Sequence, residues 1–329
     1  MFFLDYAPKY DIMLSMRNAV FLALFLACFY TEKSVADNLD LNDALKNTYT
    51  ACVNIDDNLH ELKVLAGVNT AVTAVGTAVG VGAVATGFAK VKTDADIDRL
   101  EQYLKTIEEA GKKQQTEKLS VINVTQEQIN ALFEDSNKSL QQEKQELEKL
   151  NKKSKSLGNW RTGLMAGNTA TNITGAIISS KTINKSGIQE QIEKCISATK
   201  DLNNAIIVAK LEGIDTSEAK SVYEACREYE YVDISPINKR GKGAMISSSV
   251  GAVVGGIGTI TSGVANSDNI RNDDSEVGKK KEKDLNTASN VLAVGATATS
   301  ATATIFNATQ ITAIKKLASV SEKCTGVLK

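Results

Sequence analysis

The chain has 329 residues, of which 22 are glycine, two are proline and one is histidine. Its 38 basic and 39 acidic side chains leave a formal net charge of −1, which excludes the strong basic excess of a general nucleic-acid binder. The single histidine, His60, excludes any site built on two imidazole groups, and so few prolines favour long helices over a turn-rich β fold.

Residues 1–36 have the features of an export leader. A positive charge at Arg17 precedes an apolar run, Ala19–Tyr30, that is too short to span a bilayer comfortably. The small residues of Ser34–Ala36 then provide a cleavage site. We therefore expect a signal peptide that starts at Met16 and an exported protein, located in the periplasm, the cell envelope or the medium of a bacterium.

The leader is also compatible with an uncleaved membrane anchor or, at Leu24–Cys28, with a lipoprotein signal that fits less well because Phe25 is aromatic. Cleavage after Ala36 would leave an even number of cysteines, which in an exported chain suggests two disulfides. Their spacing matches neither CxxC nor a Cys/His zinc site. The four cysteines of the expected mature chain are Cys52, Cys195, Cys226 and Cys324.

The order of segments along the chain indicates an internal duplication. Residues 79–89 match 255–265, and a second pair of segments, 164–174 and 292–302, also aligns without a gap. Each copy has a cysteine segment, a small-residue segment, a charged segment, a second small-residue segment and a second cysteine in the same order. The two expected hairpin repeats are residues 37–212 and residues 213–329.

Apolar residues recur at alternating spacings of three and four around the cysteines, which predicts helices with a packed seam. Cys52, Cys195 and Cys324 lie on such seams, where each would face a partner helix. The repeats favour Cys52 with Cys195 and Cys226 with Cys324, each pair clasping the base of one hairpin. Pairing Cys195 with Cys226 fits less well, because the two lie at unequal distances from a turn near Gly213. Buried free thiols are the alternative.

Four segments rich in Gly, Ala, Val and Thr lack charged side chains. Glycine, valine and threonine are weak helix formers, and part of the last segment alternates like a strand. The runs are nevertheless much longer than strands of ~3–10 residues and contain no proline, so we predict helices. The segments are residues 64–89, 162–180, 244–265 and 285–314.

Glycines recur four residues apart in these segments, a spacing that lets helix backbones approach closely. The pattern resembles the glycine zippers of bacterial envelope proteins; this resemblance covers about a third of the chain and implies no activity. Uncharged runs of ~20 residues also have the length to cross a membrane, so membrane contact is left open. The glycines expected at helix contacts are Gly76, Gly80, Gly87, Gly163, Gly167, Gly251 and Gly255.

Residues 91–157 are rich in Glu, Lys and Gln and predict an antiparallel coiled-coil arm. Ile97 and Leu104 mark one seam, Phe133 lies on a looser one, and the turn is expected within 111–126. The predicted fold is therefore all-α, with long antiparallel helical hairpins forming a bundle and one hairpin extended by the arm.

The sequence carries no motif for catalysis. Val79–Ala85 imitates a GxGxxA nucleotide fingerprint, but it lies inside a small-residue run with no preceding strand pattern. His60 has no triad partners, and the basic clusters Lys239–Lys242 and Lys279–Lys281 fit solvated loops, with contact to anionic lipid or glycan as the alternative. We expect no catalytic residue, cofactor, metal or small-molecule substrate.

These patterns predict a non-enzymatic exported envelope or secreted protein that binds a protein partner, or copies of itself, through its helices. The main alternative is a membrane-inserting or pore-forming helical protein that uses its Gly/Ala-rich segments. An enzyme of unrecognised type and a β-aggregating surface protein fit the patterns less well.

Overall fold

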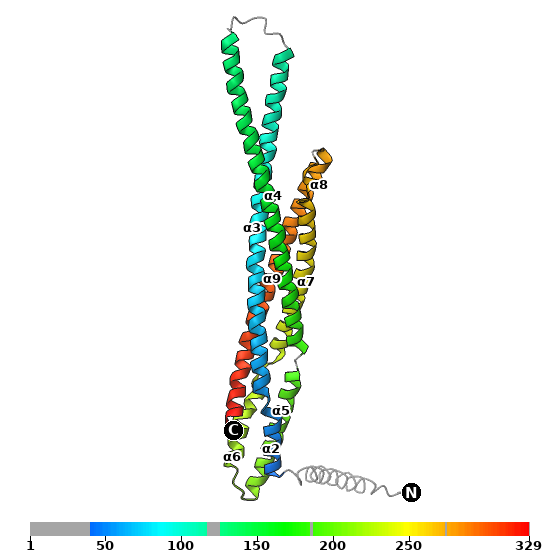
Figure 1. Cartoon of the computed structure of the whole chain (residues 1–329). Helices are drawn as coiled ribbons and strands as arrows, with labels where there is room; N and C mark the ends of the chain where they lie inside the picture. Colours follow the sequence, from blue (N-terminus) through cyan, green and yellow to red (C-terminus); the bar gives the residue numbers. More distant parts are fainter. Residues whose placement is uncertain (1–39, 117–125, 185–186, 274, 329) are drawn as a thin grey trace, which may run out of the picture. The chain divides into compact units, whose positions relative to one another are not determined.

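The computed structural model describes residues 40–116, 126–184, 187–273 and 275–328, and the side chains among them except 110–137 and 184. The described residues are almost all helical and contain no strand, so the all-α prediction is confirmed (Figure 1). The predicted leader, residues 1–36, lies outside the described residues, and so does most of the segment 111–126 in which the arm is expected to turn.

Three helices are unusually long: α3 has 62 residues, α4 has 59 and α9 has 53. No proline interrupts them, and Pro236 lies at the first turn of α7, where its missing N–H costs nothing. Buried threonines keep their hydroxyls bonded within their own helix, as Thr73 does to the Asn69 carbonyl at 2.9 Å. The elements are α2 (Leu41–Cys52), α3 (Ile55–Thr116), α4 (Gln126–Asn184), α5 (Gly187–Leu211), α6 (Ser217–Cys226), the 3-10 helix η1 (Arg227–Tyr231), α7 (Ser235–Ala265), α8 (Asp268–Arg271) and α9 (Glu276–Leu328).

The chain folds as two compact units, and each unit takes segments from both of the expected repeats. Helices α3 and α9 each pass from one unit into the other. Unit 1 comprises the described residues within 1–60, 187–233 and 316–329, and unit 2 comprises those within 61–186 and 234–315.

Unit 1 has an ordinary apolar core built from the predicted seams. Ile55, Leu59 and Leu202 are fully buried, which removes apolar surface from water and stabilises the packing of the helices. Val327, in the last turn of α9, is 41% exposed. His60 is also exposed.

All four cysteines are fully buried in unit 1 and form two pairs with disulfide geometry. Cys52 pairs with Cys195 across a Cα–Cα distance of 4.9 Å, and Cys226 pairs with Cys324 across 4.5 Å. These are the pairs that the repeats predict. Beyond that prediction, the Sγ atoms of Cys52, Cys195 and Cys324 all lie within 4.8 Å of one another, so the two pairs meet in one cluster.

Burial in unit 1 raises the pKa of the Tyr229 phenol to about 12. A phenol whose folded pKa exceeds its unfolded value of ~10 stabilises the fold fully below pH ~10, and this contribution is lost as the pH rises toward 12. We expect alkaline unfolding of unit 1 in that window, with about 2–3 kcal/mol at stake. Far-UV circular dichroism during a pH titration measures it.

Tyr229→Phe removes the titrating group and should move this alkaline transition to higher pH. Tyr231→Phe is the matched control, because the Tyr231 side chain is 77% exposed whereas Tyr229 is 1% exposed. Equal transition midpoints in both variants would contradict a role for Tyr229.

Unit 2 is a bundle of long helices. Figure 1 shows α3 and α4 as one antiparallel hairpin and α7 and α9 as another. α4 packs along α7, while α3 meets α9 through Asn69 and Asn307, whose side-chain amides are hydrogen-bonded at 2.9 Å. The two hairpins therefore share one interior.

Helices α3 and α4 both continue into the arm segment, residues 91–157, as far as they are described. Ile97 and Leu104 are buried, and the ion pair between Lys144 and Glu108, at 3.5 Å, joins the two helices. The side chain of Phe133, which the sequence places on the second seam, lies outside those described.

Candidate functional site

The side chains buried inside unit 2 are mostly small or polar, whereas the interior of a soluble protein usually holds large apolar side chains. The four uncharged stretches of unit 2, 64–89, 162–180, 244–265 and 285–314, are described in full. The large apolar side chains buried within them are only Met165 and Ile314. The remaining buried positions hold glycine, alanine, serine, threonine, asparagine and glutamine.

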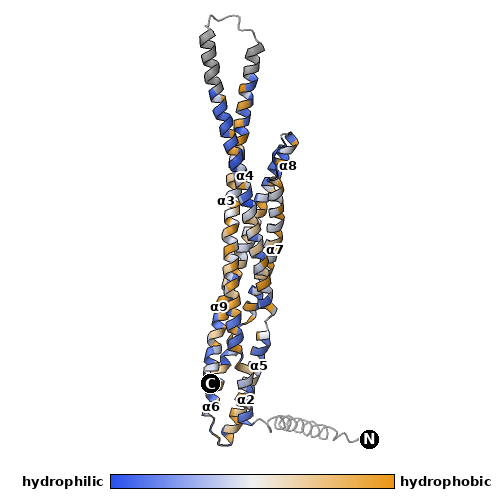
Figure 2. Ribbon diagram, viewed as in Figure 1, coloured by the Kyte–Doolittle hydropathy of each residue, from blue (hydrophilic) through white to orange (hydrophobic). Residues whose placement is uncertain are grey.

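Large apolar side chains lie instead on the outside of these stretches, on all four helices. Figure 2 shows apolar residues recurring along the middle of α3 and α7, whereas hydrophilic residues predominate toward the arm and around α8. The exposed large apolar residues are Val64, Val68, Val75, Val81 and Phe88 of α3, Ile173 and Ile177 of α4, Ile246, Val250, Val253, Ile257, Ile260 and Val264 of α7, and Val291, Val294 and Ile305 of α9.

Glycines permit the close packing of this interior. A Cβ atom added at Gly251 would lie 2.6 Å from the Thr299 hydroxyl and 2.8 Å from the Asn172 side chain, too close for either to stay in place. Gly76, Gly80, Gly87, Gly167 and Gly255 likewise face side chains of a neighbouring helix.

Gly163 is different, and the prediction that it lies at a helix contact is wrong. It is exposed, and no atom lies within 4 Å of the position that its Cβ would take. Four residues turn a helix by about 400°, so Gly163 is rotated by about 40° from Gly167, which faces Val79 of α3.

Amide side chains connect the helices inside the bundle. Asn69 of α3 donates from Nδ2 to Ser179 of α4 at 2.7 Å and to Asn307 of α9 at 2.9 Å. Asn172 of α4 donates to the hydroxyl of Ser300 of α9 at 2.8 Å. These hydrogen bonds compensate the burial of polar groups and specify which helices meet.

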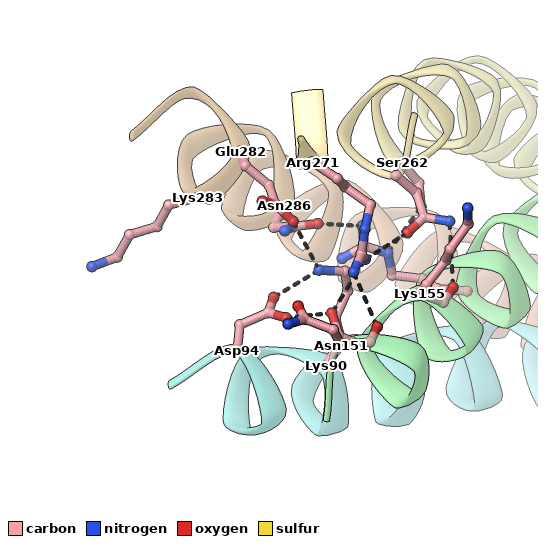
Figure 3. A network of polar contacts seen from close by, with 12 residues as sticks. Lys90, Asp94, Asn151, Lys155, Ser262, Arg271, Glu282, Lys283 and Asn286 are labelled. Atoms are coloured by element: carbon pink, nitrogen blue, oxygen red, sulfur yellow. Dashed lines mark hydrogen bonds and ion pairs between the residues drawn. The ribbon is translucent and has the colours of Figure 1, made fainter. Parts of the chain in front are cut away.

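A buried ion-pair network closes one end of this interior (Figure 3). Lys90 is fully buried, and its Nζ donates to Asp94 at 2.7 Å and to Glu282 of α9 at 3.3 Å. Ser154 of α4 also donates to Asp94. Lys283, by contrast, points away from the network in Figure 3. Because Lys90 contacts two carboxylates, its buried charge is compensated.

Arg161 belongs to the same end of the bundle and is fully buried with neutral acceptors. Its guanidinium donates to the Ser262 hydroxyl at 2.9 Å, to Asn290 at 3.1 Å and to Asn286 at 2.7 Å, thereby joining α4 to α7 and α9. Neither Lys90 nor Arg161 is among the residues that the sequence patterns single out. The sequence feature that could have identified them is their position, since each directly adjoins an uncharged stretch.

The arrangement joins the helices through buried polar contacts and close packing. Val79–Ala85 lies inside the continuous helix α3, so no strand directly precedes it and no turn is present there to receive a phosphate. His60 is exposed. Among the described residues, the cluster of candidate metal ligands that the geometry brings together is Cys52, Cys195 and Cys324 of unit 1.

No protein-family model, curated protein or solved structure matches the chain.

Proposed function

We propose that unit 2 is a membrane-inserted helical bundle and that the chain is a non-enzymatic structural or interaction protein of the bacterial envelope. The supporting observation is that polar side chains lie inside the bundle and large apolar side chains lie outside it, the reverse of their distribution in a soluble protein. Ser300 and Asn307 are 0% exposed, whereas Ile260 is 68% exposed. In lipid, acyl chains solvate the outer residues while small and amide side chains associate the helices.

The dimensions fit a bilayer. The exposed stripe of α7 from Ile246 to Val264 covers about 27 Å at ~1.5 Å per residue, against a hydrocarbon core of ~30 Å. Charged residues stand at both ends of the α7 stretch, Lys242 before it and Asp268 after it. By length and composition, the helical stretches able to cross a membrane are Leu41–Glu109, Ser235–Ala265 and Glu276–Leu328.

Lipid explains the exposed apolar residues better than a second copy of the chain. A partner molecule covers one face of a bundle, whereas these residues lie on all four helices. The bundle interior is filled, because neighbouring side chains occupy the space beside Gly76, Gly80 and Gly251. The close packing supports an anchoring role over an open pore. Export of the chain rests on its predicted leader and is consistent with the paired cysteines.

Ile257→Lys tests the proposal at the middle of the α7 stripe. A lysine at the centre of a membrane helix costs roughly 2.5–3.5 kcal/mol, so the membrane-integrated fraction after alkaline extraction should fall strongly. On a soluble protein the same change at this exposed position would be harmless. The measurement compares pellet and supernatant of the full chain expressed in bacteria.

Val277→Lys is the matched control, because Val277 is 77% exposed but lies in the charged start of α9. It should leave membrane integration unchanged. A wild-type chain that is monodisperse in buffer without detergent, and that Ile257→Lys leaves unaltered, would overturn the proposal; a dimer dissociated by Ile257→Lys would assign the stripe to a second copy.

A further inference from the structure

We infer that the four cysteines of unit 1 form a single zinc-thiolate site when the chain is reduced. Two disulfides that each link the base of a different hairpin are not required to lie in contact with each other. Here the sulfurs of Cys52, Cys195 and Cys324 lie within 4.8 Å of one another, and Cys226 is bonded to Cys324. All four side chains are 0% exposed.

Three of the four sulfurs already lie close together. Four sulfurs at ~2.3 Å from Zn²⁺ stand about 3.8 Å apart, and the sulfurs of Cys52, Cys195 and Cys324 lie within 4.8 Å of one another, while Cys226 is held beside them by its bond to Cys324. The four ligands come from α2, α5, α6 and α9. The tertiary structure therefore brings them together without the local CxxC spacing of a zinc finger.

The donor set selects a soft cation. Four thiolates favour Zn²⁺, Cd²⁺ or Co²⁺ over Mg²⁺ and Ca²⁺, which require oxygen ligands. The buried hydroxyls of Tyr229 and Ser321 lie close to each other and make no hydrogen bond to any third protein group among the described residues. Each lies three residues from a ligand, Cys226 and Cys324 respectively, and offers a donor of the kind that supports bound thiolates.

Reduction of the two disulfides supplies the four metal ligands. A thiol or phosphine reductant gives two electrons to each disulfide and is itself oxidised, and the two S–S bonds become four thiols. One Zn²⁺ then binds the four sulfurs and releases four protons. The metal replaces the two covalent links between the same helices, so unit 1 keeps its fold when its disulfides are reduced.

The test uses the full chain in detergent, reduced anaerobically with a phosphine and titrated with Co²⁺ and then Zn²⁺. We expect one Co²⁺ per chain with thiolate-to-metal absorption, displacement by Zn²⁺, and protection of all four cysteines from iodoacetamide. Cys226→Ser should weaken Co²⁺ binding by more than roughly tenfold, the least that loss of a supporting group costs. The oxidised chain, which has no free thiol among these four, is the control and should bind none.

Helical content by circular dichroism decides whether the folded chain supplies the ligands. Retention or recovery of helix on adding Zn²⁺ supports the site. No uptake of Co²⁺, uptake with fewer than four protected cysteines, or uptake without helix would each overturn the inference. Membrane insertion of unit 2 is measured separately, so either proposal can fail alone.

Discussion

Replacing Cys52 and Cys195 together by alanine is expected to lower the free energy of unfolding of unit 1 by about 3–5 kcal/mol under oxidising conditions. The pair closes a loop with a sequence separation of 143 residues, and a link across such a loop restricts the unfolded chain strongly. Both side chains are fully buried, so their loss also removes core packing. Since whole domains have only about 5–15 kcal/mol of stability, the effect should be large.

Urea unfolding of the purified chain in detergent, followed by circular dichroism, measures this difference. The matched variant is Cys226→Ala with Cys324→Ala, which removes the second pair, separated by 98 residues. Reduction without added metal should destabilise the wild type more than either oxidised double variant, because it breaks both links. Equal unfolding midpoints for the wild type in oxidised and reduced form would contradict disulfide formation.

Gly251→Val is expected to destabilise unit 2 by about 3 kcal/mol, through overpacking of the bundle interior. Its added carbons would displace Thr299 of α9 and Asn172 of α4, and Asn172 is hydrogen-bonded to Ser300. The substitution therefore disturbs a buried polar group as well as the packing. Thermal unfolding in detergent micelles, measured by circular dichroism, tests the expectation.

Gly163→Val is the matched control for that substitution. Gly163 is also helical, but nothing lies within 4 Å of its Cβ position. Valine is a better helix former than glycine, so this variant should be neutral or slightly more stable. Equal destabilisation by both substitutions would assign the effect to the helix itself and refute a role for glycine in packing.

Local patterns in the sequence are sufficient to predict much of this fold. Alternating spacings of three and four predict the buried seams of unit 1, because a helix returns to the same face with that period. The order of segments in each repeat predicts that Cys52 pairs with Cys195. The same periodicity identifies Gly251 and Gly255 as contact residues. It misplaces Gly163, since spacing alone does not say which member of a GxxxG pair faces the neighbour.

The sequence by itself determined that the chain forms long uninterrupted helices with glycine faces, because helix period, proline content and run length are local properties. Tertiary structure alone decided that the valine and isoleucine stripes face outward, that Lys90 and Arg161 become buried, and that Cys52, Cys195 and Cys324 converge. These outcomes depend on how helices far apart in the chain pack together. The segments that surround a residue then decide whether it faces a neighbour, a bilayer or an ion partner.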